Sequence, residues 1–519
     1  MEANVQTLIA MVLYIAVVIV IGAVYAKRAS KSSSHFLIGG RSLGPWVTAM
    51  AAEASDMSGW LLMGLPGVAY WYGLSDAAWT AIGLGIGTYL NWLFVAKRLR
   101  VYSHIAGDAI TIPDFLSNRF KEKKKVILII AALFILVFFS VYAASCFVTV
   151  GKLFSTLFDA KYVYMMLAGA AFVVLYTFIG GFLAESASDF MQALVMVFAL
   201  ALVFIIGIIH AGGLGAVIAN AKSIPGFLEF FGIAQPQVVD GVQQVGASGQ
   251  ALFGEAAKYG FLTIISTLSW GLGYFGMPQV LLKFMAIRKS SEITLSRRIA
   301  TIWVIVSLAA AVAIGIIGRV LYPAELLTQS DAERIFIIMS ADFFLPFLAG
   351  IVMAGILAAT ISSSDSYLLI AASALSKNIY KGLLKKDATD RQVLVASRIT
   401  LLIVAVVAAI IALNENSIIF MVVSFAWAGF GATFGPIILF SLFWKRVTRA
   451  GAIAGMIAGG GMVFVWKLLV RPLGGAFDIY ELLPAFVLSC IVIVIVSYLS
   501  QEESKEIQDE FELARVTEI

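Results

Sequence analysis

Charged residues are scarce in this sequence. Asp, Glu, Lys and Arg make up 13% of its 519 residues, whereas ordinary soluble domains carry about 25%. Hydrophobic residues make up 61% of the chain, and its mean hydropathy is +0.96. This composition excludes a soluble globular protein and predicts an all-α polytopic membrane protein in a lipid bilayer.

Cysteine and histidine are almost absent. Cys146 and Cys490 both lie in apolar runs, which excludes a disulfide framework. The histidines His35, His104 and His210 are scattered and form no metal or nucleophile site, so an enzyme is not expected. The sequence has no Gly-x-x-x-x-Gly-Lys loop, so we expect no nucleotide partner and no transport driven directly by ATP. The net charge of +5 gives no reason to expect nucleic acid as a partner.

Apolar segments of about 20 residues, long enough to span a membrane, recur thirteen times. They begin near residues 7, 45, 77, 126, 162, 189, 257, 298, 346, 396, 418, 449 and 480. Lys and Arg gather in alternate loops, at 27–41, 97–125, 283–298, 377–398 and 444–449. The positive-inside rule therefore predicts thirteen transmembrane helices, with the N-terminus outside and the C-terminus inside. The acidic tail at 501–519 is expected to be a solvated cytoplasmic helix.

The second apolar segment contains an acid and several helix breakers. Asp56 lies among small residues in 54–67, where three glycines and Pro66 predict an interrupted helix. An acid inside a membrane segment suggests a functional site by default. Irregular backbone at membrane depth is tolerated only where protein buries it or where it lines a cavity. The carbonyl groups freed at such a break are candidate cation ligands.

A second interrupted segment, 269–278, lies in the seventh apolar span. Broken helices in corresponding positions of two halves indicate the midplane site of a secondary transporter. We therefore predict an inverted five-helix repeat, with helices 2–6 at 45–211 and helices 7–11 at 257–442. The other parts are a first helix and cytoplasmic loop (1–44), an extracellular loop (212–256), helices 12 and 13 (443–500) and the tail. The alternative is that these glycines only allow helices to pack closely.

Polar residues cluster in the ninth span. Ala359, Ser362 and Ser363 share one helix face, and Ser362, Asp365 and Ser366 share the next turn. Hard cations prefer such oxygen ligands. The alternative is that these serines hydrogen-bond only to backbone or to a neighbouring helix.

The chain resembles the sodium/solute symporter family over nearly its whole length, and within that family its proline-transporting bacterial members. The motifs that carry the resemblance lie at 39–45, 54–67, 176–184, 270–278, 426–436 and 445–455. The resemblance implies a leucine-transporter-type fold with one helix before the repeat and two after it. It also implies sodium-coupled symport of L-proline into a bacterial cell, across the cytoplasmic (inner) membrane, by alternating access. The expected partners are sodium, proline or a similar small solute, and lipid.

Carried over by position, the resemblance implies two sets of site residues. The sodium ligands would be the main-chain oxygens of Ala54, Met57 and Ala359 and the hydroxyls of Ser362 and Ser363. Asp56 matches an acid that sodium binding needs, and it could act indirectly by holding the backbone. The substrate would contact Ser58, Trp60, Tyr142, Trp270, Tyr274 and Pro278. Aromatic rings suit an apolar pyrrolidine ring, and the free N–H groups of a broken helix suit its carboxylate. The alternative is that these rings only pack or face lipid.

Several acids depart from the pattern of the proline-transporting members, namely Glu53, Glu185 and Asp365. Relatives that transport sialic acid imply a second sodium between Asp189 and the positions of Ser362, Asp365 and Ser366. Alternatively, Asp189 is a surface carboxylate at a helix N-terminus. For Asp365, the alternative is that it lies close enough to the cytoplasm to be hydrated, or that it pairs with a basic loop residue such as Arg41 or Lys377.

Three other function classes remain open. A proton-coupled symporter would need a relay, which Glu53, Asp56, Glu185, Asp189 and Asp365 could supply, although the serine pair favours a metal cation. A sodium-coupled symporter of another small amino acid or organic solute would keep the same ion site. A channel or a membrane sensor would lack the paired broken helices, and a sensor would also carry a soluble signalling domain.

Overall fold

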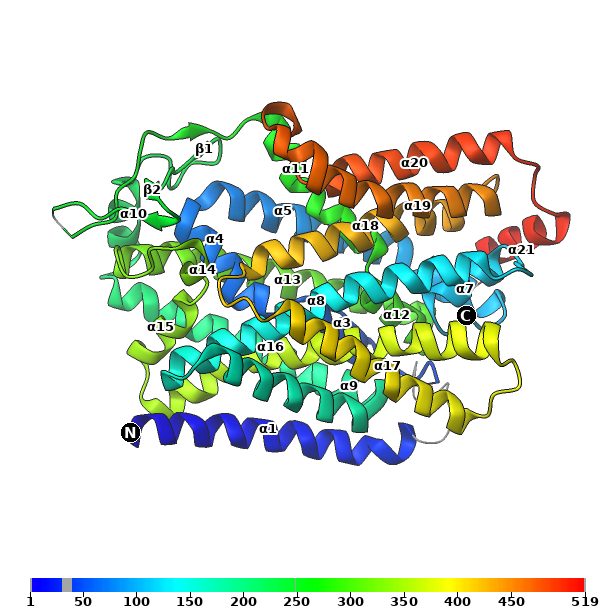
Figure 1. Ribbon diagram of the computed structural model, residues 1–519, viewed down its shortest axis with the longest axis horizontal. Coiled ribbons are helices and arrows are strands. Elements are labelled where there is room, and N and C mark those ends of the chain that lie inside the picture. Colours follow the sequence, from blue (N-terminus) through cyan, green and yellow to red (C-terminus); the bar gives the residue numbers. More distant parts are fainter. Residues whose placement is uncertain (1, 30–39, 248, 518–519) are drawn as a thin grey trace.

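The computed structural model describes residues 2–29, 40–247 and 249–517. Long helices run side by side along the longest axis of the molecule, and the two chain termini lie at opposite ends of this bundle (Figure 1). Among the described residues, nine helices are long and apolar enough to cross a membrane. Three shorter apolar helices, Val5–Ile21, Tyr162–Phe178 and Phe261–Gly276, match the expected spans 1, 5 and 7. The number thirteen and the orientation of the termini stay predictions.

The bundle is built from two consecutive sets of helices. The first set comprises α1 (Glu2–Ala29), α3 (Pro45–Asp56), η1 (Trp60–Gly64), α4 (Leu65–Tyr72), α5 (Leu74–Leu90), η2 (Asn91–Val95), α6 (Ala96–Ile105), α7 (Ile112–Arg119), α8 (Val126–Phe158), α9 (Tyr162–His210) and α10 (Leu214–Lys222). The second set comprises α11 (Phe261–Leu268), η3 (Ser269–Gly276), α12 (Pro278–Ala286), η4 (Ser290–Glu292), α13 (Ile293–Leu321), α14 (Gln329–Ala332), α15 (Ile335–Phe343), α16 (Pro346–Ser373), η5 (Ala374–Leu384), α17 (Asp390–Ile411), α18 (Ile419–Phe443), α19 (Arg449–Val465), η6 (Trp466–Val470), η7 (Arg471–Leu473), η8 (Gly475–Phe477), α20 (Leu482–Leu499) and α21 (Lys505–Val516).

Both predicted helix interruptions are present. The α-helix α3 ends at Asp56, and a π-helical turn, η1, leads into α4. The second interruption runs through the 3-10 segment η3, after which α12 begins at Pro278. Proline suits this first helical position because its missing N–H would have no intrahelical partner there.

The fifth and sixth spans, predicted as separate helices that begin near 162 and 189, form one continuous helix, α9. A contact within α9 shows that this helix is bent. The hydroxyl groups of Tyr176 and Ser188 lie 2.7 Å apart. In a straight helix these two residues would stand about 18 Å apart, at 1.5 Å per residue. The bend lets the halves of α9 run as two spans without a loop.

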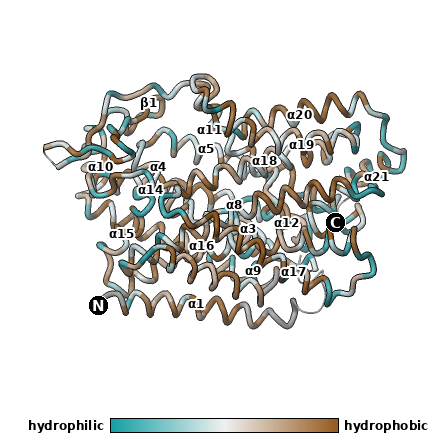
Figure 2. Tube along the Cα trace, in the orientation of Figure 1, coloured by the Kyte–Doolittle hydropathy of each residue, from teal (hydrophilic) through white to brown (hydrophobic). Residues whose placement is uncertain are grey.

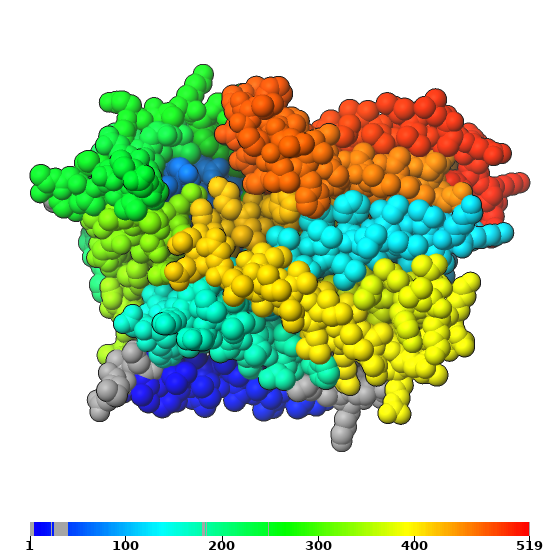
Figure 3. All heavy atoms as spheres, viewed as in Figure 1, coloured from blue at the N-terminus to red at the C-terminus, as the bar shows by residue number. Residues whose placement is uncertain are grey.

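The core of the bundle is α16, which contacts α1, α8, α9 and α17. Its residues from Val352 to Ser373 are all buried, so even its serines and Asp365 are away from lipid. Helix α1 packs outside α9 and α16, and Figure 3 shows it along the lower edge of the molecule, beside the teal surface of α9. Hydrophobic residues follow the long helices, whereas hydrophilic residues gather mainly in the loops at both ends (Figure 2).

The predicted extracellular loop at 212–256 contains α10 and short strands at the end of the bundle where the N-terminus lies (Figure 1). Strand β1 (Gly232–Ile233) pairs antiparallel with β4 (Ala257–Lys258), with Gly232 opposite Lys258. Strand β2 (Val238–Val239) pairs antiparallel with β3 (Val242–Gln243), with Val239 opposite Val242.

Two predictions about the loops at the other end need correction. The loop expected at 283–298 begins later, because α12 continues to Ala286 and buries Lys283 inside the bundle. The tail forms the expected helix, α21, but that helix is not fully solvated. Its Phe511 is buried, and the guanidinium carbons of Arg98 and Arg119 lie 5.1 and 5.4 Å from the centre of the Phe511 ring. Of the basic loop predicted at 27–41, residues 30–39 lie outside the described part of the chain.

The tail helix is also held by an ion pair. The Lys121 ammonium lies 2.7 Å from a carboxylate oxygen of Glu510, and this contact raises the pKa of Lys121 above its ordinary value. The tail therefore packs against neighbouring helix ends and is not free in solution.

Helix α5 packs against η3 through glycine. A Cβ atom at Gly87 would lie 2.3 Å from the carbonyl oxygen of Gly271, whereas one at Gly85 would have no atom within 4 Å. We expect Gly87→Ala to lower the free energy of unfolding in detergent by about 1–3 kcal/mol, the usual cost of overpacking a tight contact, and so to lower the melting temperature. Gly85→Ala is the matched control and should be neutral or slightly stabilising, because alanine is the better helix former. Equal melting temperatures for the two variants would contradict this packing.

Candidate cation and substrate site

Oxygen atoms from α3 and α16 form a buried cluster beside the first helix interruption. The Ser362 hydroxyl donates to the Ala54 carbonyl oxygen at 2.8 Å and lies 3.2 Å from the Ala359 carbonyl oxygen. The Ser363 hydroxyl donates to the same Ala54 oxygen at 3.3 Å. Four of the five predicted sodium ligands therefore lie together.

The end of α3 explains why the Ala54 oxygen is available. The carbonyl groups in the last turn of a helix have no intrahelical donor, and they carry the negative end of the helix dipole. Met57, the fifth predicted ligand, follows α3 with φ −83° and ψ 72°, outside the helical region. Its carbonyl stays a predicted ligand.

The cluster is chemically suited to a small monovalent cation. Each serine hydroxyl has lone pairs as well as its proton, so it can donate to a carbonyl oxygen or bind a cation through oxygen. The donor set consists of neutral carbonyl and hydroxyl oxygens, which hard cations prefer. Every residue of the set is fully buried.

Asp56 lies next to this cluster, at the end of α3. Its main-chain oxygen accepts hydrogen bonds from the Trp60 indole and the Tyr142 phenol, both at 3.3 Å. Within the described residues neither oxygen of its buried carboxyl group makes a hydrogen bond of standard geometry, and the Tyr274 phenol lies beside it. A buried polar group without a partner calls for an explanation. A role of Asp56 in sodium binding stays a prediction.

Aromatic rings from both interrupted helices and from α18 surround the same region. The ring centres of Trp60 and Trp270 lie 6.3 Å apart, and those of Tyr274 and Trp427 lie 5.0 Å apart. Ser58 lies beside the Tyr142 phenol. Five of the six predicted substrate residues therefore gather around the first break.

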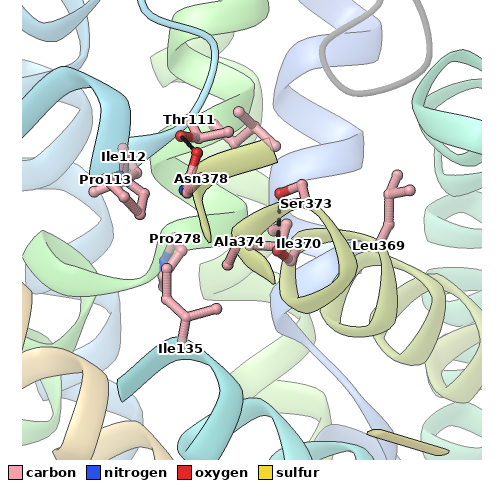
Figure 4. A pocket seen from close by; sticks show the side chains of 11 residues that line it. Thr111, Ile112, Pro113, Ile135, Pro278, Leu369, Ile370, Ser373, Ala374 and Asn378 are labelled. Carbon is pink, nitrogen blue, oxygen red and sulfur yellow. Dashed lines mark hydrogen bonds between the residues drawn. The ribbon is translucent and has the colours of Figure 1, made fainter. Parts of the chain in front are cut away.

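Pro278 is the exception among these six. It lines a separate small cavity together with Ile135, Thr111 and Asn378, and the Thr111 hydroxyl lies 3.4 Å from the Asn378 amide oxygen (Figure 4). The described contacts do not bring Pro278 to the aromatic rings. Its place in the substrate site stays a prediction.

The sequence analysis missed several residues that hold this region together. The Trp427 indole donates to the Trp270 carbonyl oxygen at 2.8 Å, and the Asn91 amide donates to the Tyr274 carbonyl oxygen at 2.9 Å. The Trp92 indole donates to the Glu53 carboxylate at 3.1 Å, so Glu53 is buried beside η2. Trp427 lies in the family motif at 426–436, which could have pointed to it. No motif pointed to Asn91 or Trp92.

The predicted second cation site contains a lysine. The Lys283 ammonium lies 2.7 Å from Glu185 Oε1 and 3.2 Å from Asp189 Oδ2. The Ser366 hydroxyl donates to the same Glu185 oxygen, and the Ser366 backbone N–H donates to Asp365 Oδ1 at 2.8 Å. Asp189, Asp365 and Ser366 are thus close together, as predicted, but around an ammonium group. The second sodium ion stays a prediction.

The alternatives for the two acids are wrong. Asp189 is fully buried in the middle of α9 and is no surface carboxylate at a helix N-terminus. Asp365 is only 2% exposed. The proposed basic partners of Asp365 lie elsewhere, because Lys377 pairs with Asp114 and Arg41 pairs with Asp108, both at 3.0 Å.

Comparison with known proteins gives a consistent result. Residues 36–459 match the sequence profile of the sodium:solute symporter family. The chain is 40% identical to the sodium/proline symporters of Staphylococcus aureus strains USA300 and COL over 520 residues, which cover 99% of this chain and 96% of each relative.

Solved structures share the fold at low sequence identity. A sodium-coupled sialic acid symporter in a substrate-bound, outward-open state has a TM-score of 0.75 at 17% identity, over 96% of this chain and 99% of that one. Mhp1, a nucleobase-cation-symport-1 family transporter in a closed conformation, has a TM-score of 0.52 at 13% identity, over 92% and 98%. The chain therefore has a fold of the leucine-transporter type.

The oxygen cluster leads to a prediction about the ion. Ser362→Ala and Ser363→Ala should each raise the sodium concentration for half-maximal uptake about tenfold or more, because contacts with a charged partner are typically worth about 1.5–3 kcal/mol. Ser364→Ala is the matched control, since the Ser364 hydroxyl bonds back to Thr360 in its own helix. Uptake by all three variants is measured against sodium concentration. Unchanged sodium dependence in both test variants would rule out this site.

Proposed function

This chain belongs to the sodium:solute symporter family, whose members are transporters and not enzymes, and from that membership we propose that it imports L-proline with sodium by alternating access. The main support is the cluster in which Ser362 and Ser363 meet the Ala54 carbonyl at the end of α3. The cluster joins an interrupted helix to the core helix α16 through groups that also suit sodium.

Coupling follows from the connection between the two sites. Sodium bound by the last carbonyls of α3 and by the α16 hydroxyls would fix the conformation of the break. The Asp56 carbonyl, two residues after Ala54, accepts hydrogen bonds from Trp60 and Tyr142, so the same backbone orients two predicted substrate residues. Sodium and substrate would then raise each other's affinity by the same factor.

The energy available to such a carrier is substantial. One charge that crosses about 100 mV supplies about 2.3 kcal/mol. A roughly tenfold sodium gradient adds about 1.4 kcal/mol. A carrier that moves one sodium per substrate could therefore accumulate solute several hundredfold at about 1.4 kcal/mol per factor of ten.

Proline fits the chemistry around the break. Its pyrrolidine ring is apolar and suits the rings of Trp60, Trp270 and Tyr274, which are at most 4% exposed. Its carboxylate suits the free N–H groups of an interrupted helix. The sodium/proline symporters at 40% identity support the same choice. Another small amino acid or organic solute on the same sodium site is the alternative.

The proposed topology has thirteen spans, with the N-terminus outside and the C-terminus inside a bacterial cytoplasmic membrane. It is supported by the alternation of basic loops along the sequence. The position of the termini at opposite ends of the bundle agrees with an odd number of crossings (Figure 1).

Uptake of labelled proline into proteoliposomes tests the function. We expect accumulation with an inward sodium gradient, and competition by unlabelled proline but not by larger amino acids. The control is an inward proton gradient at equal sodium on both sides, which should give no accumulation. Accumulation driven by protons alone would contradict sodium coupling, and sodium-driven uptake of a different solute would contradict proline.

Tyr274 gives the matching prediction for the substrate. Tyr274→Ala should weaken proline binding about tenfold and change sodium affinity less, because the ring lies with the aromatic residues and not with the serine pair. Tyr89→Ala, on the exposed face of α5, is the control. The two affinities are measured by equilibrium binding. A change in proline affinity below twofold, about 0.4 kcal/mol, would place the pocket elsewhere.

A further inference from the structure

Lys283 is buried inside the helix bundle. Among the described residues, Lys152 and Lys283 are the two buried lysines, and Lys283 is 1% exposed. Its ammonium lies 2.7 Å from Glu185 Oε1, 3.0 Å from Ser186 Oγ and 3.2 Å from Asp189 Oδ2. These contacts can use all three of its N–H groups. The ammonium also lies 4.5 Å from the centre of the Phe182 ring.

The contacts of Lys283 join three helices. The lysine belongs to α12, the second half of the interrupted helix that carries Tyr274. Glu185 and Asp189 belong to α9, and Ser366 of α16 completes the cluster through its hydrogen bond to Glu185. A buried charge is tolerated only when it is paired and hydrogen-bonded. The lysine and the acids therefore require each other.

We propose that the ammonium of Lys283 takes the place of a second sodium ion beside Asp189, so that a single sodium accompanies each solute. The inference rests on the proposed sodium-coupled transport. A sodium ion in this position would need the Asp189 carboxylate and hydroxyl oxygens of α16. Lys283 already holds one Asp189 oxygen, and the Ser366 hydroxyl is hydrogen-bonded to Glu185. A sodium ion there would also meet the positive charge of Lys283 at close range.

The surrounding acids predict what removal of the ammonium would do. Glu185 Oε2, Asp189 Oδ1 and Asp365 Oδ2 are buried and have no hydrogen-bond partner among the described residues. Three carboxyl groups therefore surround the single ammonium group of Lys283, and each has one oxygen without a partner in the described part of the chain. A variant that lacks the ammonium but has room in its place should therefore bind a cation there.

Counting bound sodium on the purified, unmodified protein is the first test. Equilibrium binding of radioactive sodium should saturate at one ion per chain. Two ions per chain would overturn the inference and leave the proposed function intact. No bound sodium would overturn the proposed function, and the inference with it.

Variants of Lys283 give the second test. Lys283→Ala should bind two sodium ions per chain, and the Hill coefficient of its sodium dependence should rise from about 1 toward 2, the number of sites. Lys283→Arg keeps a cation and should stay at one ion. Lys152→Ala is the matched control, since Lys152 is equally buried but pairs with the single acid Glu333 at 2.7 Å. One ion per chain in Lys283→Ala would overturn the inference.

Asp365→Asn keeps the proposal testable if Lys283→Ala does not fold. The Asp365 carboxyl accepts a backbone N–H and contributes to the field around Lys283. Its substitution should leave sodium affinity within about twofold of the unmodified protein. A loss of about tenfold or more would overturn the inference, because Asp365 would then be a sodium ligand.

Discussion

The hydrogen bonds from Ser362 and Ser363 to the Ala54 carbonyl are the interaction on which the site depends. Inside a membrane, backbone groups freed by a helix break must find partners within the protein. Here the end of α3 finds them on α16, a helix that is buried along most of its length. The same contact brings cation ligands together and fixes the position of Asp56, whose carbonyl in turn receives Trp60 and Tyr142. A structural need of the broken helix and the proposed ion binding are thus met by the same atoms.

Charges inside the bundle follow a similar principle. Lys283 joins α12 to α9, and Lys152 of α8 pairs with Glu333, which also accepts the backbone N–H groups of Ile419 and Phe420 at the start of α18. Each buried lysine therefore ties helices that are distant in sequence. Removing one partner of such a pair typically destabilises the protein strongly, because the other charge is then left buried without a partner. These pairs restrict how the helices can be arranged, and in Lys283 the restriction lies next to the proposed ion site.

Much of the fold was predictable because lipid imposes simple rules on a sequence. Apolar segments matched helices, and glycine and proline marked both interruptions, since few other residues tolerate such breaks. The prediction failed where the same local sequence pattern was compatible with two structures. Spans 5 and 6 became one bent helix, α9. Lys283 looked like the first residue of a basic loop, but α12 carries it into the bundle. The acidic residues of the tail predicted a solvated helix, whereas Phe511 gives this helix a buried face.

The sequence by itself determined the membrane class, the two interrupted helices and the serine face of α16, because composition and helical periodicity are local properties. Local spacing placed Asp365 and Ser366 on one helix turn, whereas only the family resemblance joined Asp189 to them. Only the tertiary structure decided what these groups face. Ser362 faces Ala54, 308 positions away in the chain, and Lys283 faces Glu185, 98 positions away. Such pairings depend on how helices pack, and no local pattern records which buried charge will meet which.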